Sequence, residues 1–412
     1  MNRKTYQVPP RGPRQPTLEA VGPFLAPGLS VIGLVLVGVI SLGLINGRLP
    51  SFGGFGGPDS SDDGGPIKTP TPSDVIIIDP RSEIPGTIAY IKAGNIWIQS
   101  GDRVYRLTNS GQDAMPSWSP DGEWIYFIRY TDVSGQFVIG GDRKRYALHV
   151  PQVMRIRPDS DSQPELLMSG LVKKGDQRWS AFIRQPVLSP NLNTLALVSD
   201  SPDPLQTDVV VQFFDLTTRQ LTNPGLDQIR PLGHQDPEWA PDGSTLLFVK
   251  NGREGSRGAP MLMRYRLSKN RLTVLAGPGY NSPSWSRDGR FIAATRTDGL
   301  GTDVVILDAT TGAELLRVTN DGRSFSGVWS PVGDALAYLH IDRGVVDLVT
   351  VKLVGTGPDW TLGETIPLTD AAGLDGASRP SWFVPANLLP QPTPTPVPSV
   401  TVAPSTPVSP IP

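Results

Sequence analysis

The chain has 412 residues and a formal net charge of −2, from 37 lysines and arginines against 39 aspartates and glutamates. This near-neutral balance argues against a bulk nucleic-acid binder, which normally carries a basic face. The absence of cysteine excludes disulfides, zinc ribbons, iron–sulfur clusters, thiol catalysis and lipoprotein anchoring through Cys. The 44 glycines and 43 prolines, with only 18% charged residues, argue against long solvated helices.

The N-terminal part divides by composition into three segments. Residues 1–28, with six prolines and four basic residues, are expected to be a disordered cytoplasmic tail. The run LSVIGLVLVGVISLGLI from Leu29 carries no charge, so we assign a transmembrane helix to residues 29–46. Residues 47–86, rich in Gly, Ser, Asp and Pro, are expected to form a flexible linker.

Charges beside the apolar run predict its orientation. Arg3, Lys4, Arg11 and Arg14 precede it, whereas only Arg48 lies close behind it. The positive-inside rule then places the N-terminus in the cytoplasm and the rest of the chain outside. Because no A-x-A cleavage site follows the run, an uncleaved signal anchor is favoured, with a cleaved signal peptide as the alternative. We therefore expect a single-pass protein of the cell membrane.

The region after the linker contains a repeated motif. Full copies read PSWSPDGEWIYFIRY, PEWAPDGSTLLFVK and PSWSRDGRFIAATR, each a short strand ending in Trp, a tight turn and an apolar strand. The aligned anchor positions are Trp118, Leu188, Trp239, Trp285, Trp329 and Trp382. Spacings of 44 to 70 residues between anchors, with Pro and Gly in every unit, are typical of propeller blades rather than of helical repeats.

The turn after each anchor has a clear residue logic. Pro sets φ for the first central position, Asp suits the second, and Gly takes the left-handed conformation that follows. Such carboxylates are structural turn residues rather than a catalytic set. The pairs concerned are Asp121 and Gly122, Asp242 and Gly243, and Asp288 and Gly289. In the third copy Asn191 and Leu192 replace Asp-Gly, which puts that hairpin turn in doubt.

The two ends of the repeat region complement each other. The first unit opens at Thr87 without a Trp strand of its own, and the last is followed by an orphan strand, Pro380–Phe383. Placing the orphan in the first blade closes the ring and removes a free sheet edge. We therefore predict an all-β fold, a six-bladed β-propeller over residues 87–384 closed by a C-terminal strand and preceded by one transmembrane helix. Residues 385–412 are expected to be a Pro/Thr-rich disordered tail.

These strings resemble the TolB-type six-bladed propeller, also called the WD-like Pro/Asp repeat. The resemblance rests on PSWSPDG, the apolar strand, a D-hydrophobic-D strand and R-L-T, and it covers about three quarters of the chain. It implies a non-enzymatic module that binds or scaffolds a protein or peptide partner at the cell envelope, with a peptide segment in the central channel. The alternative is an envelope hydrolase or lyase that acts on glycan or peptide from the same channel.

The sequence offers little for catalysis or for metal binding. Its three histidines lack H-x-x-x-H and H-E-x-x-H spacing, and no G-x-S-x-G elbow occurs. We therefore predict no catalytic residue, metal, cofactor or nucleic-acid partner. His234, two residues from Asp236, is expected in a loop that faces one end of the channel.

The second blade carries a long insertion, Thr131–Arg184, which is expected to form solvated loops. It holds nine basic residues against six acids. The candidate binding surface consists of Arg143, Lys144, Arg145, His234 and Asp236. The basic part would suit an acidic partner, an anionic polymer or lipid headgroups, and a plain solvated face is the alternative.

Overall fold

The computed structural model describes residues 79–139, 141–159, 161–202, 208–226, 233–251 and 260–390. All of them belong to Asp62–Pro412, the second of the two compact units into which the chain divides. The predicted segments 1–28 and 29–46, and most of the segments 47–86 and 385–412, lie outside the described residues. None of the helices in the described part is long and apolar enough to cross a membrane.

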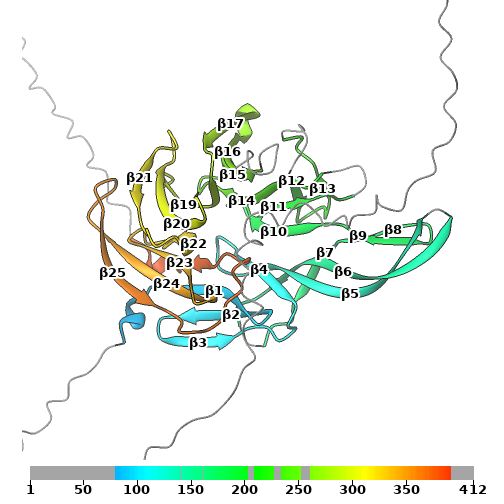
Figure 1. The fold of residues 1–412 in the computed structure, drawn as a ribbon, viewed down its shortest axis with the longest axis horizontal. Helices are drawn as coiled ribbons and strands as arrows, with labels where there is room; N and C mark the ends of the chain where they lie inside the picture. The colour runs from blue at the N-terminus through cyan, green and yellow to red at the C-terminus, as the bar shows by residue number, and fades with distance from the viewer. Residues whose placement is uncertain are drawn as a thin grey trace, which may run out of the picture. The chain divides into compact units, whose positions relative to one another are not determined.

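The described strands form six antiparallel sheets, one for each predicted blade (Figure 1). Blade 1 contains β26 (Ser381–Phe383), β1 (Thr87–Lys92), β2 (Asn95–Ser100) and β3 (Arg103–Arg106). Blade 2 contains β4 (Asp113–Trp118), β5 (Ile125–Ile139), β6 (Asp142–Ile156) and β7 (Glu165–Ser169). Blade 3 contains β10 (Ile183–Leu188), β11 (Thr194–Ser199), β12 (Val210–Asp215) and β13 (Leu221–Thr222). Blade 4 contains β14 (His234–Trp239), β15 (Thr245–Lys250), β16 (Met261–Arg266) and β17 (Arg271–Ala276). Blade 5 contains β18 (Tyr280–Trp285), β19 (Phe291–Asp298), β20 (Gly301–Asp308) and β21 (Glu314–Arg317). Blade 6 contains β22 (Ser324–Trp329), β23 (Ala335–Asp342), β24 (Val345–Val354) and β25 (Thr361–Pro367).

The blades are arranged around a common centre. The anchor strands β4, β10, β14, β18 and β22 each contact the next in chain order, and β26 contacts both β22 and β4. In the described residues, three short 3-10 helices lie outside the sheets: η1 (Pro80–Glu83), η3 (Leu267–Lys269) and η4 (Ala386–Leu388). The described part of the chain is therefore an all-β, six-bladed propeller, as predicted.

The C-terminal strand closes the ring where the sequence predicts it. β26 pairs antiparallel with β1, with Ile88 opposite Trp382 and Thr87 opposite Phe383. Trp382 donates a hydrogen bond from Nε1 to the carbonyl of Pro85 at 2.8 Å. Phe383 stacks on Trp118 of blade 2, with ring centroids 5.3 Å apart. The last strand of the propeller thus completes the first blade and contacts the second.

Alternating side chains explain why the central strands are apolar along their whole length. Successive residues of a strand point to opposite faces, and each blade has a neighbour on both faces. In β15, Leu246 and Phe248 pack in the cluster shared with blade 3, whereas Leu247 and Val249 pack in the cluster shared with blade 5. Six such clusters, one between each pair of neighbouring blades, make up the core of the described residues.

The turns after the anchors follow the predicted residue logic. In the first full copy, Gly122 has a φ of +73° and donates from its amide to the carbonyl of Ser119 at 2.9 Å. Asp121 accepts from the Ser119 hydroxyl and from the amide of Glu123. A Cβ on Gly122 would also lie 2.1 Å from the ring of Phe383. The glycine therefore serves both the turn and the ring closure.

The third turn keeps this conformation despite its different sequence, so the doubt about it was misplaced. Leu192 has a φ of +62° and donates to the carbonyl of Ser189 at 2.9 Å. Asn191 takes the role of the aspartate, because its Oδ1 accepts from the Ser189 hydroxyl and from the amide of Asn193. The turn thus tolerates a leucine in the left-handed region at the expense of backbone strain.

Leu192→Gly is expected to stabilise the protein by about 1 kcal/mol. Left-handed backbone costs a non-glycine residue roughly 1–2 kcal/mol, and the extra chain entropy of glycine offsets part of that gain. Leu192 is 42% exposed, so little burial is lost. Urea denaturation followed by circular dichroism measures the change. The matched control is Gly243→Leu at the equivalent position, where φ is +70° and the free energy of unfolding should fall.

The long insertion of blade 2 is mostly β-structure, so the prediction of solvated loops is wrong. β5 and β6 continue far beyond the blade as a hairpin in register from Ile125 opposite Ile156 to Ile139 opposite Asp142. A second hairpin, β8 (Leu171–Lys174) and β9 (Gln177–Ser180), joins it through Gln136 opposite Arg178. We call these distal parts of β5 and β6, with β8 and β9, the arm; Figure 1 shows it extending away from the blades.

Candidate functional site

A bulge recurs in the anchor strands at the centre of the propeller. In five of them the strand register shifts three residues before the anchor, at a residue with φ near +50°. These bulge residues are Met115, Gln185, Asp236, Ser282 and Ser326. The residue just before each of the six anchors then lines a common central pocket.

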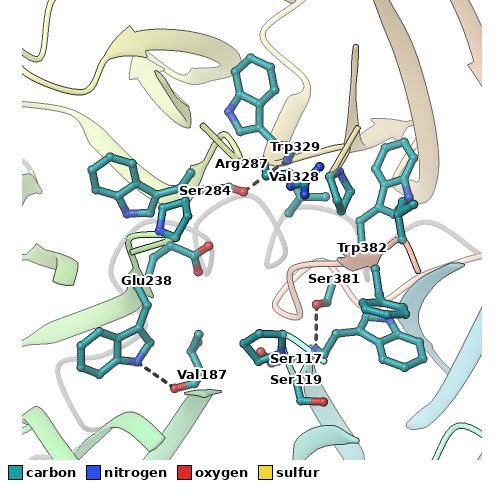
Figure 2. Close-up of a pocket in the computed structure, with 18 of the residues that line it drawn as sticks. Ser117, Ser119, Val187, Glu238, Ser284, Arg287, Val328, Trp329, Ser381 and Trp382 are labelled. Atoms are coloured by element: carbon teal, nitrogen blue, oxygen red, sulfur yellow. Dashed lines mark hydrogen bonds between the residues drawn. The ribbon is translucent and has the colours of Figure 1, made fainter. Parts of the chain in front are cut away.

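The central pocket has a volume of about 340 Å³ and is lined by residues from all six blades (Figure 2). Its inner layer consists of Ser117, Val187, Glu238, Ser284, Val328 and Ser381. The anchors and the first central residues of their turns form the outer layer: Trp118, Leu188, Trp239, Trp285, Trp329, Trp382, Pro120, Pro190, Pro241, Arg287 and Pro331. The pocket therefore offers aromatic and proline surfaces with a few hydroxyl groups, one carboxylate and the guanidinium groups of Arg287 and Arg379.

One ion pair crosses the pocket between blade 4 and blade 1. The Nη2 of Arg379 lies 2.5 Å from Oε2 of Glu238, and the two side chains are only 23% and 17% exposed. Arg379 also donates to the carbonyl of Pro283. Burial raises the pKa of the Glu238 carboxyl, and the charge and hydrogen bond of Arg379 oppose that rise. The guanidinium thus compensates the charge of a carboxylate that is largely buried.

Hydrogen bonds between neighbouring blades hold the pocket wall in place. The Ser381 hydroxyl accepts from the amide of Trp118 at 3.0 Å, and the Ser284 hydroxyl accepts from the amide of Trp329 at 3.3 Å. The wall residues are therefore positioned by the blades on either side of them. Such a site is preformed, which lowers the entropy cost of binding a ligand.

His234 and Asp236 lie inside β14, so the loop expected there is not present. His234 is 2% exposed, and its Nδ1 accepts a hydrogen bond from the amide of Val211 at 3.1 Å. Asp236 bridges two blades: it accepts from the Gln185 side chain and, through Oδ2, from the amide of Ser282 at 2.9 Å. The structure gives both residues contacts that hold neighbouring strands together.

The three predicted basic residues lie on the arm, apart from β14. Arg143, Lys144 and Arg145 are exposed on β6, and Arg143 forms an ion pair with Asp176. The structure thus separates the five candidate residues into an exposed arm and the interior of blade 4.

The strand register places further cations beside Arg145. Arg145 is opposite Gln136, Gln136 is opposite Arg178, and Arg178 is opposite Lys173. Directly opposed residues share one face of a sheet, so Arg145, Arg178 and Lys173 lie in one row across the arm. The basic part of the predicted surface is a sheet face rather than a loop.

Sequence reasoning did not single out Glu238, Arg379 or Arg287. Glu238 and Arg379 are 141 residues apart, and only ring closure brings them together. A signal for Arg287 was present, because it occupies the turn position that is proline in the other four copies with a following hairpin. Within the described ranges no three His, Asp or Glu side chains come together as a metal site.

Comparisons with known proteins agree with this architecture. No protein-family model matches the sequence, and a search of curated proteins finds no match. Among solved structures, TolB from Acinetobacter baumannii is similar with a TM-score of 0.51 and 19% identity, over 72% of this chain and 66% of that chain, slightly less than two thirds of its length. A putative TolB from Agrobacterium tumefaciens has a TM-score of 0.49 and 15% identity, over 72% of this chain and 93% of that chain. A chain of a nidogen/laminin complex has a TM-score of 0.50 and 9% identity, over 73% of this chain and 98% of that chain.

At these identities the comparisons show the fold alone. The described part of the chain is a six-bladed β-propeller of the TolB-like kind.

Proposed function

We propose that this protein binds a segment of a partner protein in its central pocket and acts as a binding or scaffolding module at the cell envelope. The single observation that carries the proposal is the pocket itself, to which all six blades contribute. Its volume of about 340 Å³ lies in the range of ligand sites and accommodates a few residues of an extended chain. Tryptophan and proline surfaces suit apolar side chains, and the serine hydroxyls suit peptide groups.

The charges in the pocket favour binding over the enzymatic alternative. An envelope hydrolase or lyase needs an acid and a base, or a paired carboxylate set, within reach of one substrate. Among the residues that line the pocket, Glu238 is the one carboxylate, no histidine accompanies it, and Arg379 occupies its Oε2. A hydrolase or lyase would have to find its second proton-transfer group elsewhere.

Filling the pocket tests the binding function. A phage-displayed peptide library selected on the full chain supplies the probe peptides. Ser117→Phe, which fills the inner layer, should weaken the selected peptides at least tenfold by fluorescence polarisation. Ser268→Phe on the exposed η3 helix is the matched control and should change nothing. A selection whose peptides bind both variants equally would place recognition outside the pocket.

The location rests on the sequence, since the uncharged run 29–45 follows a basic N-terminal segment. Deletion of residues 29–45 should move the protein from the membrane pellet to the supernatant of lysed cells, whereas deletion of residues 391–412 should leave it in the pellet. External protease on intact cells should digest the propeller of the anchored form. An intact chain that is already in the supernatant, or one fully protected from protease, would contradict this location.

A further inference from the structure

A second cavity lies between blades 4 and 5, next to the central pocket. It has a volume of about 470 Å³, and we call it the inter-blade groove. It is lined by two anchor turns, by the end of β16 and by the turn after β20. Its polar lining residues include Asp242, Arg264, Arg266, Arg287, Asp288 and Thr310. Pro241, Trp285 and Arg287 line both cavities, so the groove adjoins the central pocket.

Three arginines without a carboxylate partner in the described part of the chain line the groove. Arg264 and Arg266 come from β16 and are half-buried, and Arg287 comes from the exposed anchor turn of blade 5. None of them forms an ion pair with a described residue, whereas other arginines of blade 5, such as Arg290 and Arg317, do. The groove is therefore lined by three guanidinium groups against the two carboxylates of Asp242 and Asp288, which leaves a net positive charge.

Two backbone carbonyls of blade 5 hold the Arg264 guanidinium in place at the groove. Its Nη1 donates to the carbonyls of Ala309 at 3.1 Å and Thr310 at 2.9 Å, which fixes the plane of the guanidinium. Its Nε is buried and has no hydrogen-bond acceptor among the described residues. Burial, together with repulsion from Arg266 and Arg271, lowers the pKa of Arg264. A bound anion would offset the repulsion between Arg264 and Arg266.

The two carboxylates that line the groove are used within their own turns. Asp242 accepts from the amide and the hydroxyl of Ser244. Asp288 accepts from the Ser286 hydroxyl and forms an ion pair with Arg290 at 2.7 Å. Neither carboxylate forms a hydrogen bond or ion pair with Arg264, Arg266 or Arg287, so the charges of these three residues are not paired within the groove.

Arg287 breaks a local rule of the repeat. The first central position of the anchor turn is Pro120, Pro190, Pro241 and Pro331 in the other copies that continue into a hairpin. Proline pre-sets the backbone of this turn, so arginine gives up a local advantage. The one copy that departs from proline places its side chain between the two cavities.

We propose that the inter-blade groove is a binding site for the phosphoryl group of a small phosphorylated molecule. A phosphoryl dianion has three acceptor oxygens and nearly two negative charges, which suits three guanidinium groups contributed by two neighbouring blades. A single carboxylate has two acceptor oxygens and one negative charge, so it would compensate fewer of them. The volume of about 470 Å³ leaves room for a small organic group beside the phosphoryl group. This site does not depend on peptide binding in the central pocket.

Calorimetric titration of the full chain with pyrophosphate at low ionic strength tests the site. Arg287→Pro should weaken binding at least tenfold, and it should fold because it restores the residue of the other turns. Arg264→Gln should have a similar effect, because it removes the charge while it keeps a side chain that donates hydrogen bonds. The matched control is Arg323→Gln, which removes an arginine paired with Asp342 on blade 6 and should leave the affinity unchanged.

A second anion and a variant of the central pocket test the phosphoryl assignment and its independence of peptide binding. Succinate, a dianion of two carboxylates, should bind at least tenfold more weakly than pyrophosphate, and equal affinity would overturn the phosphoryl assignment. Equal affinity of Arg287→Pro, Arg264→Gln and the unmodified chain would overturn the site. Ser117→Phe should leave pyrophosphate binding intact, so a failure of peptide binding in that variant is distinguishable from a failure of the groove.

Discussion

Trp382→Ala is expected to lower the free energy of unfolding by about 3–5 kcal/mol. The side chain is 8% exposed and packs in the cluster between blades 6 and 1, so its removal leaves a cavity at the ring closure. The loss of its hydrogen bond to Pro85 adds to the effect. Small domains have total stabilities of about 5–15 kcal/mol, so the change should be plain in urea denaturation.

The matched control for this variant is Leu388→Ala. Leu388 lies six residues further along the chain but is 54% exposed, and its substitution should cost less than about 0.5 kcal/mol. A chain that ends at Pro380 lacks β26 and leaves one edge of β1 unpaired, so it should aggregate. A chain that ends at Pro390 keeps β26 and should stay monodisperse. Equal effects of Trp382→Ala and Leu388→Ala would contradict closure by β26.

Arg379→Met is expected to destabilise the protein by about 3–5 kcal/mol at pH 7. The substitution leaves the Glu238 carboxylate in a nearly buried pocket without its cation, and an uncompensated buried charge is costly. The double variant Glu238→Gln/Arg379→Met removes both charges and should recover most of the loss. Denaturation midpoints of the unmodified chain, both single variants and the double variant give the coupling between the two groups.

The pH dependence of Arg379→Met follows from the direction of the Glu238 pKa. Burial raises this pKa above its value in the unfolded chain, about 4.3, and the loss of Arg379 should raise it further. A raised carboxyl pKa contributes stability that is fully present below the unfolded pKa and is lost as the pH rises through the folded one. The stability gap between Arg379→Met and the unmodified chain should therefore narrow as the pH falls toward 4. A constant gap would mean that Glu238 is not the group responsible.

The blade number and the ring closure were predictable because they depend on local chemistry that repeats. Each copy carries its own turn residues, and β26 pairs with β1, which opens at Thr87, where the sequence predicts the ring to close. The position of the orphan strand at Trp382 in blade 1 followed from counting the strands of each unit. The deviation at Leu192 was overestimated, because Asn191 supplies the same side-chain acceptor as aspartate and the flanking strands hold the turn.

The contents of the two cavities could not be predicted in the same way. The Glu238–Arg379 pair and the groove between blades 4 and 5 depend on how whole blades meet, which no single repeat encodes. The arm was missed for a different reason. Its strands are rich in charged residues, and their exposed faces lack the apolar pattern by which strands of the blades are recognised.

A cross-link between β26 and β1 shows directly whether the last strand closes the ring. Ala89 and Ser381 are directly opposed in the antiparallel pair, where Cα atoms lie about 4.5–5.5 Å apart, within the reach of a disulfide. Because the chain contains no cysteine, Ala89→Cys/Ser381→Cys introduces the only possible pair. Oxidation of the full chain should form this bond, and Ser381→Cys/Thr365→Cys, with its second cysteine on β25, should form none. A disulfide to β25 instead of β1 would contradict the account.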